Sequence, residues 1–285
     1  ERMFKIVEKC TLAPGVHQYE VEAPLVAKGA RPGNFVVVRT SETGERIPLT
    51  IAGHNRETGT ITLVVQEVGK STMEMGMLEV GDYFKDVAGP LGQATRIEKV
   101  GTVVAVAGGI GVAPVLPQIR AHKAIGNHVI SIVGARTRDL LVLRDEVEKF
   151  SDEVIWATDD GSLGYHGFVS GALEELIGSG QKIDEVIAIG PVRMMQAVAD
   201  VTRKHNIPTT VSLNAIMVDG TGMCGCCRVT VDGEVKFSCV DGPEFDGHKV
   251  DFDELVSRQG FFRDKEQIAR ERFEADRGGC KCHAK

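Results

Sequence analysis

The chain concentrates thiols in the segment MVDGTGMCGCC, which spans residues 217–227. Cys224, Cys226 and Cys227 occupy three of four successive positions, and Cys239 follows across a stretch that predicts a β-hairpin with an Asp-Gly turn. Thiolates at such close spacing are ligands for zinc or for iron–sulfur clusters. The segment therefore predicts a metal site.

Two kinds of metal site compete for these thiols. Structural zinc usually takes four Cys or His ligands, often in two spaced pairs, but no second pair is obvious and His248 has no suitably spaced partner. A plant-type [2Fe–2S] cluster uses C-x4-C-x2-C and a distant fourth ligand, and counting back from Cys224 places Asp219 first. We predict such a cluster, with zinc as the alternative and Cys226 as a surplus thiol. The predicted metal ligands are Asp219, Cys224, Cys227 and Cys239.

A glycine-rich turn, AGGIGVAP at 107–114, follows a predicted strand and begins a predicted helix. Glycines let the backbone approach a pyrophosphate, and a helix N-terminus favours an anion. Pro114 replaces the third glycine of the usual fingerprint and suits the first turn of a helix. Each such turn alone is more typical of an ordinary connection, but a second, AIGPVRMM at 188–195, lies after a later predicted strand. The candidate dinucleotide-binding residues are Gly108, Gly109, Gly111, Ala113, Pro114, Arg136, Asp159, Gly190, Pro191 and Met194.

The N-terminal part holds a second candidate for phosphate binding, formed by RIPLT at 46–50 and EVGKST at 67–72. An arginine with nearby hydroxyls and a glycine turn can hold a diphosphate through charge-assisted hydrogen bonds. Alone, Arg46 is more typical of a solvated edge residue, but a nucleotide-binding segment downstream favours the binding role. The candidate residues for this second nucleotide site are Arg46, Pro48, Leu49, Thr50, Val64, Val65, Gly69, Lys70, Ser71 and Thr72.

The elements that position these motifs indicate a multidomain β plus α/β protein. Short alternating strands predict an antiparallel β-barrel over 1–98, with turns at 31–35 and 80–92. Apolar strands that alternate with helices predict a doubly wound parallel α/β domain over 99–212. A small cluster domain at 213–250 and a polar helical tail at 251–285, suited to subunit contact, complete the predicted organisation.

The bulk composition narrows the class of protein. The 285 residues are 42% hydrophobic and 26% charged, and a net charge of −7 with no basic stripe argues against nucleic-acid binding. No apolar run approaches the roughly 20 residues of a membrane helix, and the first residues lack a secretory signal and an initiator Met. Seven cysteines without an export signal predict metal or redox chemistry in a reducing compartment, the cytoplasm.

The order of motifs resembles the ferredoxin–NADP reductase superfamily. RIPLT matches its Arg-x-x-Ser/Thr flavin motif, and GGIGVAP matches its Gly-Gly-x-Gly-x-Ala-Pro nicotinamide loop. With the C-terminal cysteines, the chain is similar to the electron-transfer subunit of dihydroorotate dehydrogenase, which has Cys at the first ligand position. The aspartate there resembles more closely the small subunits of NADH-dependent reduced ferredoxin:NADP oxidoreductases, also called sulfide dehydrogenases.

That resemblance implies that the candidate residues of the barrel bind FAD and that those of the α/β domain bind NAD(H). It also implies one [2Fe–2S] cluster with mixed Asp and Cys ligation. It implies hydride transfer between NAD(H) and flavin N5 without a protein acid or base. It also implies a large partner subunit that binds NADP(H), carries its own FAD and [4Fe–4S] clusters, reacts with ferredoxin and performs electron bifurcation. Arg136 and Arg138 could meet a 2′-phosphate, but the resemblance favours NAD(H) for this chain.

Two other functions stay open at this stage. One is electron transfer to a dihydroorotate-oxidising partner, and the other is a zinc-stabilised nucleotide-binding regulatory module. The tail sequence CKCH at 280–283 could bind metal but is more typical of a flexible end, and Cys10 suits a packing role. Neither a nucleic-acid partner nor a membrane partner is expected.

Overall fold

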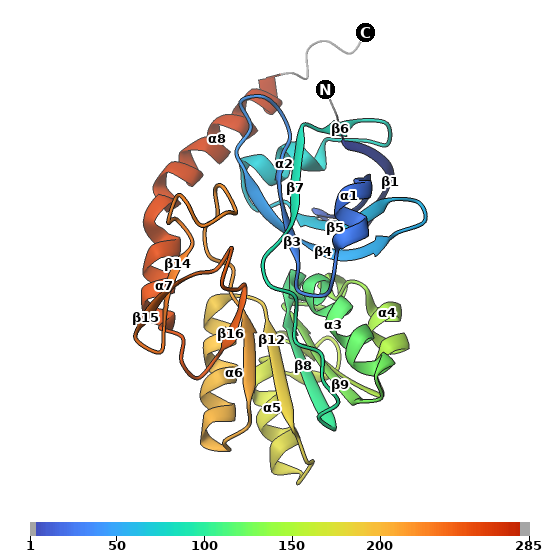
Figure 1. Ribbon diagram of the computed structural model, residues 1–285, viewed down its shortest axis with the longest axis vertical. Helices are drawn as coiled ribbons and strands as arrows, with labels where there is room; N and C mark the ends of the chain where they lie inside the picture. Colours follow the sequence, from blue (N-terminus) through green and yellow to red (C-terminus); the bar gives the residue numbers. More distant parts are fainter. Residues whose placement is uncertain (1–3, 280–285) are drawn as a thin grey trace.

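The computed structural model describes residues 4–279, so the CKCH tail lies outside the described residues. The first part of the chain forms a seven-stranded antiparallel sheet in the order β6-β1-β2-β5-β4-β3-β7, which curls in the upper half of Figure 1. Its elements are β1 (Phe4–Ala13), β2 (Val16–Glu22), α1 (Pro24–Gly29), β3 (Phe35–Arg39), β4 (Ile47–Asn55), β5 (Thr60–Gln66), α2 (Lys70–Gly76), β6 (Tyr83–Phe84) and β7 (Asp86–Leu91).

Alternation along β5 shows how this sheet divides its side chains. Ile61, Leu63 and Val65 face the core of the curled sheet, whereas Val64 packs with apolar residues of the following domain. The prediction of a turn over 80–92 was wrong, because β6 and β7 lie within it. Glycine and proline suggested a turn there, yet β7 is an edge strand, where a proline such as Pro90 is tolerated.

A second sheet follows in the order β11-β10-β9-β8-β12-β13-β16. All its strands are parallel except β16. Both faces of β8 are buried, because α3 and α4 cover one face while α5 and α6 cover the other. Its elements are β8 (Thr102–Gly108), η1 (Gly109–Gly111), α3 (Val112–Ala124), β9 (His128–Ala135), η2 (Arg138–Leu140), α4 (Arg144–Phe150), β10 (Glu153–Thr158), β11 (Tyr165–His166), α5 (Val169–Gly178), β12 (Glu185–Ile189), α6 (Val192–Lys204), β13 (Thr209–Ser212) and β16 (Glu244–Asp246).

The C-terminal part is built onto this sheet. The hairpin of β14 (Arg228–Val231) and β15 (Glu234–Phe237) confirms the predicted Asp-Gly turn, since Asp232 and Gly233 have φ values of 55° and 75°. Strand β16 then pairs with β13, which the sequence had not indicated. Helix α7 (Phe252–Gln259), η3 (Gly260–Phe262) and α8 (Arg263–Gly279) close the described chain, and α8 runs up the flank of the molecule (Figure 1).

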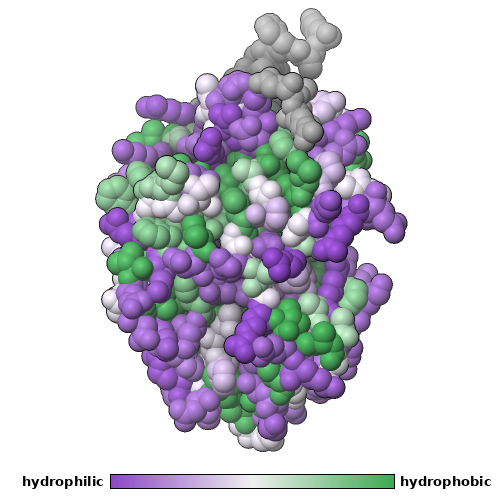
Figure 2. Space-filling view, in the orientation of Figure 1, coloured by the Kyte–Doolittle hydropathy of each residue, from purple (hydrophilic) through white to green (hydrophobic). Residues whose placement is uncertain are grey.

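The described parts share their apolar cores. One core joins α3 to Ala52 and Val64 of the first sheet, and another joins α6 to Cys227 and Cys239. Hydrophilic residues cover most of the face in Figure 2. Pale green, weakly hydrophobic residues gather on the left, where Figure 1 shows the loop that contains residues 217–227. Among residues 4–279, no helix is long and apolar enough to cross a membrane.

Candidate functional site

The two predicted nucleotide motifs meet at one cavity of about 480 Å³. It opens at the carboxyl ends of β8 and β12, which are neighbours in the sheet although β9, β10 and β11 come between them in the chain. Ligands bind at such a reversal of strand order in open α/β sheets. The predicted residues that line the cavity are Pro48, Thr50, Gly108, Gly109, Gly111, Pro114, Gly190 and Pro191.

The glycines of this cavity are required by close packing. A Cβ atom on Gly111 would strike the carbonyl oxygen of Ile189, and a Cβ atom on Gly108 would strike the sulfur of Met194. Gly109 instead has φ of 56° and open space beside it, so its backbone is bare toward the cavity. Gly111 therefore lets the end of β12 approach the turn, Gly108 makes room for Met194 of α6, and Gly109 exposes backbone for a ligand.

Four of the predicted NAD(H) residues lie outside the cavity wall. Ala113 is buried against α3 neighbours, while Arg136 and Asp159 are exposed after β9 and β10, at the same edge of the sheet. Met194 packs behind Gly108 and Gly190. The structure thus brings the glycine turns together, and it leaves Arg136 and Asp159 farther along the same edge.

The predicted flavin residues divide by the alternation of β4. Pro48 and Thr50 face the cavity, whereas Leu49 packs against the core of the first sheet. Val64 and Val65 are buried and do not line the cavity. Arg46 is exposed immediately before β4, and no carboxylate of the described chain pairs with it. A free guanidinium at this position fits a phosphate group.

The segment from Gly69 to Thr72 caps α2. Thr72 Oγ1 accepts hydrogen bonds from the backbone N–H groups of Val68 and Gly69. Ser71 donates its hydroxyl to Glu45 Oε2 at 2.6 Å, and Lys70 lies 3.6 Å from Glu74. Ser71 can donate to a diphosphate only after it has released Glu45. The residues present fit FAD on this condition.

Sequence reasoning missed part of the cavity wall. Ser212 ends β13 and Asn214 follows it, so the end of the last parallel strand was the available signal. Gln259 carried no local signal, because it reaches the cavity from α7. Its Nε2 donates to the carbonyl and side-chain oxygens of Asn214, at 2.8 and 3.0 Å.

A half-buried carboxyl group, that of Glu244, follows Pro243 of the cavity wall in the chain. Glu244 Oε1 accepts hydrogen bonds from Thr95 Oγ1 and from Gln118 Nε2, both at 2.7 Å. Burial, opposed by the hydrogen bond from Thr95 and reinforced by nearby Glu185, raises the pKa of the Glu244 carboxyl to about 7. Through one titratable group, Glu244 of β16 thus binds both Thr95, in the connection between the two sheets, and Gln118 of α3.

The segment 217–227, called the cysteine loop below, holds the predicted metal ligands in two pairs together with Cys239. Cys227 Sγ and Cys239 Sγ are 3.2 Å apart and buried. Asp219 Oδ2 accepts from the backbone N–H of Cys224 at 2.8 Å, and its Oδ1 accepts from Thr221 N at 2.7 Å. The N–H groups of Thr221 and Cys224 lower the pKa of Asp219 and keep the carboxylate ionised.

The two donor pairs match the division of ligands in a two-iron cluster. Among the described residues, no group of three or more His, Cys, Asp or Glu side chains is gathered for a single metal ion. Each iron of a [2Fe–2S] cluster takes two protein ligands, and the pairs Asp219 with Cys224 and Cys227 with Cys239 match that division. The donor set therefore fits the cluster, and the four-ligand assignment itself stays a prediction.

The loop around these ligands depends on left-handed glycines. Gly220, Gly222 and Gly225 have φ values of 78°, 83° and 67°, a region that other residues rarely adopt. A Cβ atom on Gly220 would lie 2.6 Å from Leu91 Cδ1 of β7, so the loop packs directly on the first sheet. The three glycines let the backbone fold tightly around the donors.

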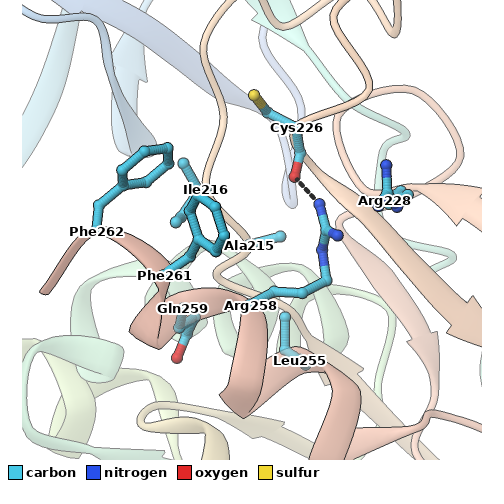
Figure 3. A pocket seen from close by; sticks show the side chains of 9 residues that line it. All are labelled: Ala215, Ile216, Cys226, Arg228, Leu255, Arg258, Gln259, Phe261 and Phe262. Carbon is cyan, nitrogen blue, oxygen red and sulfur yellow. Dashed lines mark hydrogen bonds between the residues drawn. The ribbon is translucent and has the colours of Figure 1, made fainter.

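Cys226 lies beside the two pairs. Its carbonyl oxygen accepts from Arg258 Nη2 at 3.0 Å, as Figure 3 shows, and its thiol is half-buried. Burial and contact with the Cys224 thiol raise the pKa of Cys226. Because that contact brings it close to a predicted ligand, its role as a surplus thiol also stays a prediction.

Two family models match the chain at the motifs described above. The iron–sulfur cluster binding domain of dihydroorotate dehydrogenase B matches residues 214–251, and the oxidoreductase NAD-binding domain matches residues 105–200. These matches favour an iron–sulfur cluster over zinc at the cysteine loop. They confirm the prediction of an oxidoreductase with NAD-binding and iron–sulfur domains.

Similar proteins extend the likeness over nearly the whole chain. A Thermotoga maritima homolog of the electron transfer subunit of dihydroorotate dehydrogenase B (NAD(+)) is 48% identical, over 94% of this chain and 95% of its own length. A probable electron transfer subunit of that enzyme from Methanocaldococcus jannaschii is 36% identical, over 88% of this chain and 90% of its own. A solved structure of an NADH-dependent reduced ferredoxin-NADP oxidoreductase, described with flavin-based electron bifurcation, is 46% identical over 96% of this chain and 98% of its own, with a TM-score of 0.91.

These likenesses confirm the β plus α/β fold class and the expected cofactor types, which are a flavin, NAD and an iron–sulfur cluster. They also agree with a subunit that works with another chain. Cofactor-binding roles of individual residues, and the domain boundaries 1–98, 99–212, 213–250 and 251–285, stay predictions.

Proposed function

The chain belongs to the family of the electron-transfer subunits of dihydroorotate dehydrogenase B and their homologues, and we propose that it serves an NADH-dependent reduced ferredoxin:NADP oxidoreductase. The observation that carries this proposal is the cavity in which Pro48 and Thr50 of the first sheet face the glycine turns of the second. That geometry suits a flavin ring stacked on a nicotinamide ring. Asp219 in place of a first cysteine favours this oxidoreductase over its relatives.

In the proposed function, the chain positions two nucleotides and supplies no acid or base. The turns at Gly108–Gly111 and Gly190 receive the pyrophosphate of NADH, and Arg46 with the start of α2 receives the diphosphate of FAD. The bound flavin would supply hydride exchange with NAD(H) and release of single electrons. Water is restricted by the apolar wall of Ile110, Ile189 and Leu213.

The cysteine loop has the complementary task of holding the cluster. Asp219 provides an anionic oxygen donor, and Cys224, Cys227 and Cys239 provide sulfur donors. Because the carboxylate keeps the charge of a thiolate, its effect on the cluster must come from the harder oxygen and from the N–H groups that already bind it.

The proposed partner is a large subunit that binds NADP(H), carries FAD and [4Fe–4S] clusters and reacts with ferredoxin, so that electron bifurcation takes place in the complex. In this arrangement residues 1–98 bind FAD, 99–212 bind NAD(H), 213–250 hold the cluster and the tail from 251 contacts the partner. We place the complex in the cytoplasm, where free thiols persist.

A second candidate function is electron transfer to a dihydroorotate-oxidising subunit. It is favoured by the cluster-domain match at residues 214–251. Purification of the tagged chain from its native host distinguishes the two. We expect a partner with flavin and several iron–sulfur clusters, and NADH- and ferredoxin-dependent reduction of NADP+. A cluster-free partner that oxidises dihydroorotate would establish the second function, and one zinc per chain without flavin absorption would exclude both.

A further inference from the structure

Helix α8 is the least covered element of the described chain. Between residues 263 and 276, whose side chains are described, only Ala269 and Phe273 are half-buried, and the rest are exposed. Helices in globular proteins gain most of their stability by packing an apolar face. The ion pair between Arg270 and Glu274, at 2.9 Å and half-exposed, adds little. This helix leaves most of its surface available to another chain.

Large apolar side chains gather where α8 begins. Phe261 is 79% exposed, and its ring meets that of Phe262 edge to face with 5.0 Å between centroids. Met223 of the cysteine loop, whose Cys226 lines the same cavity as Phe261 and Phe262, is 89% exposed. Single exposed apolar residues are ordinary, but a group of them marks an interaction surface.

A cavity of about 250 Å³ opens beside these phenylalanines (Figure 3). Leu255 and Ala215 contribute apolar surface, Cys226 lies on the opposite side from Leu255, and the guanidinium groups of Arg258 and Arg228 enter from the side away from the phenylalanines.

The two arginines determine what the cavity can accept. Arg258 donates to the Cys226 carbonyl, which leaves most of its N–H donors free, and Arg228 is exposed at the rim. Neither guanidinium forms an ion pair with a carboxylate in the part of the chain that the structure describes. Arginine binds carboxylates through two parallel hydrogen bonds, so an acidic group between apolar neighbours is the complementary occupant.

We propose that η3, the start of α8 and the cavity between Arg228 and Arg258 form the docking surface for the partner subunit, which inserts an acidic side chain flanked by apolar residues beside Cys226. The inference rests on the proposed function, because it takes the partner to be the large subunit. A protein fits better than a small anion, because the exposed surface continues beyond the cavity along α8. Docking there excludes water from the cysteine loop.

The test measures complex formation by variants of the full chain. The tagged chain and the large subunit that co-purifies with it are separated and recombined, and the dissociation constant is measured at low and high salt. We expect Phe261→Ser to weaken binding at least about tenfold. We expect Arg228→Glu to weaken it about tenfold and to reduce its salt dependence. Phe168→Ser is the matched control, because Phe168 is a 71% exposed aromatic residue at the start of α5.

Iron content, flavin content and NADH oxidation with an artificial acceptor must equal those of the wild type, which shows that each variant is folded. If the wild-type complex forms and both variants bind as tightly as Phe168→Ser, the docking surface is wrong. If Phe261→Ser instead disperses a homodimer, the occupant is a second copy and the proposal also fails. If no flavin and [4Fe–4S] subunit accompanies the wild type, the proposed function fails first.

Discussion

The nucleotide cavity and the cysteine loop are organised in opposite ways. The cavity is made by strand ends and glycine turns whose positions are fixed by the sheets, and its close approaches involve backbone atoms of Gly108, Gly111 and Ile189. In the loop, Asp219 and Cys224 are held by short local hydrogen bonds and by the packing of Gly220 on β7, and no strand ends frame them in the described chain. The first site is preorganised by the fold, whereas the second needs its metal to unite two pairs of donors.

Removal of a buried thiol gives the largest expected effect. Cys227→Ser takes one donor from the pair with Cys239 and leaves the cavity untouched, so we expect the iron content to fall at least about tenfold. NADH and FAD binding should stay within about twofold, because the preorganised site does not depend on the metal. Iron analysis and binding titrations check both parts. A variant that loses its nucleotides together with its iron would contradict the independence of the two sites.

A methyl group added at Gly111 should disturb the nucleotide cavity and leave the cysteine loop unchanged. In Gly111→Ala, Cβ meets the Ile189 carbonyl, so β8 and β12 must separate at the cavity. We expect stability to fall by about 1–3 kcal/mol and the Kd for NADH to rise by about a hundredfold, which corresponds to roughly 3 kcal/mol.

Gly178→Ala is the control for this change, because Gly178 lies at the end of α5 and its new methyl group would meet no atom within 4 Å apart from its chain neighbours and the backbone of its own helix. It should leave both quantities unchanged or raise stability slightly. Calorimetry and thermal unfolding provide the measurements. Tight NADH binding by Gly111→Ala would show that the close approach is not needed.

The carboxyl group of Glu244 should make the free energy of unfolding depend on pH. Its pKa rises from an ordinary value near 4.5 to about 7 on folding, so the folded state holds the proton more tightly. Stability from this group is complete below pH 4.5 and is lost as the pH rises to 7, by about 2–3 kcal/mol.

Glu244→Gln removes this titration and keeps the two hydrogen bonds. We expect the variant to gain stability relative to the wild type as the pH rises from 5 to 8. Denaturant unfolding at both pH values checks the sign. Parallel stabilities at the two pH values would mean that the carboxyl titrates normally.

The smallest expected effect concerns the identity of one ligand. Asp219→Cys should retain a cluster, because both residues supply an anionic donor, but its absorption spectrum and reduction potential should change. Cys226→Ser should change neither. Loss of iron from the Cys226 variant would instead place that thiol, which touches Cys224, among the ligands.

Many residues of the cavity and of the cysteine loop could be predicted because their motifs are short spacings between neighbouring residues. Glycine turns after apolar strands and cysteine spacing need only neighbouring residues, and the cavity and the two donor pairs contain those residues. The turn predicted over 80–92 failed because β7 is stabilised by pairing with β3, far away in the chain. Gln259 was missed for the same kind of reason, since α7 reaches the cavity only in the folded state.

The pairing of β16 with β13 fixes how far Cys239 lies from the wall of the nucleotide cavity. Ser212, on the cavity wall, lies opposite Glu244, only five residues beyond Cys239. Slippage of that pairing by two residues would displace the segment by roughly 7 Å. It would also pull Cys239 out of an apolar core that it shares with α6 and β3. The separation of the nucleotide cavity and the cysteine loop is therefore set by the register of β13 and β16, which can change only in whole residue steps.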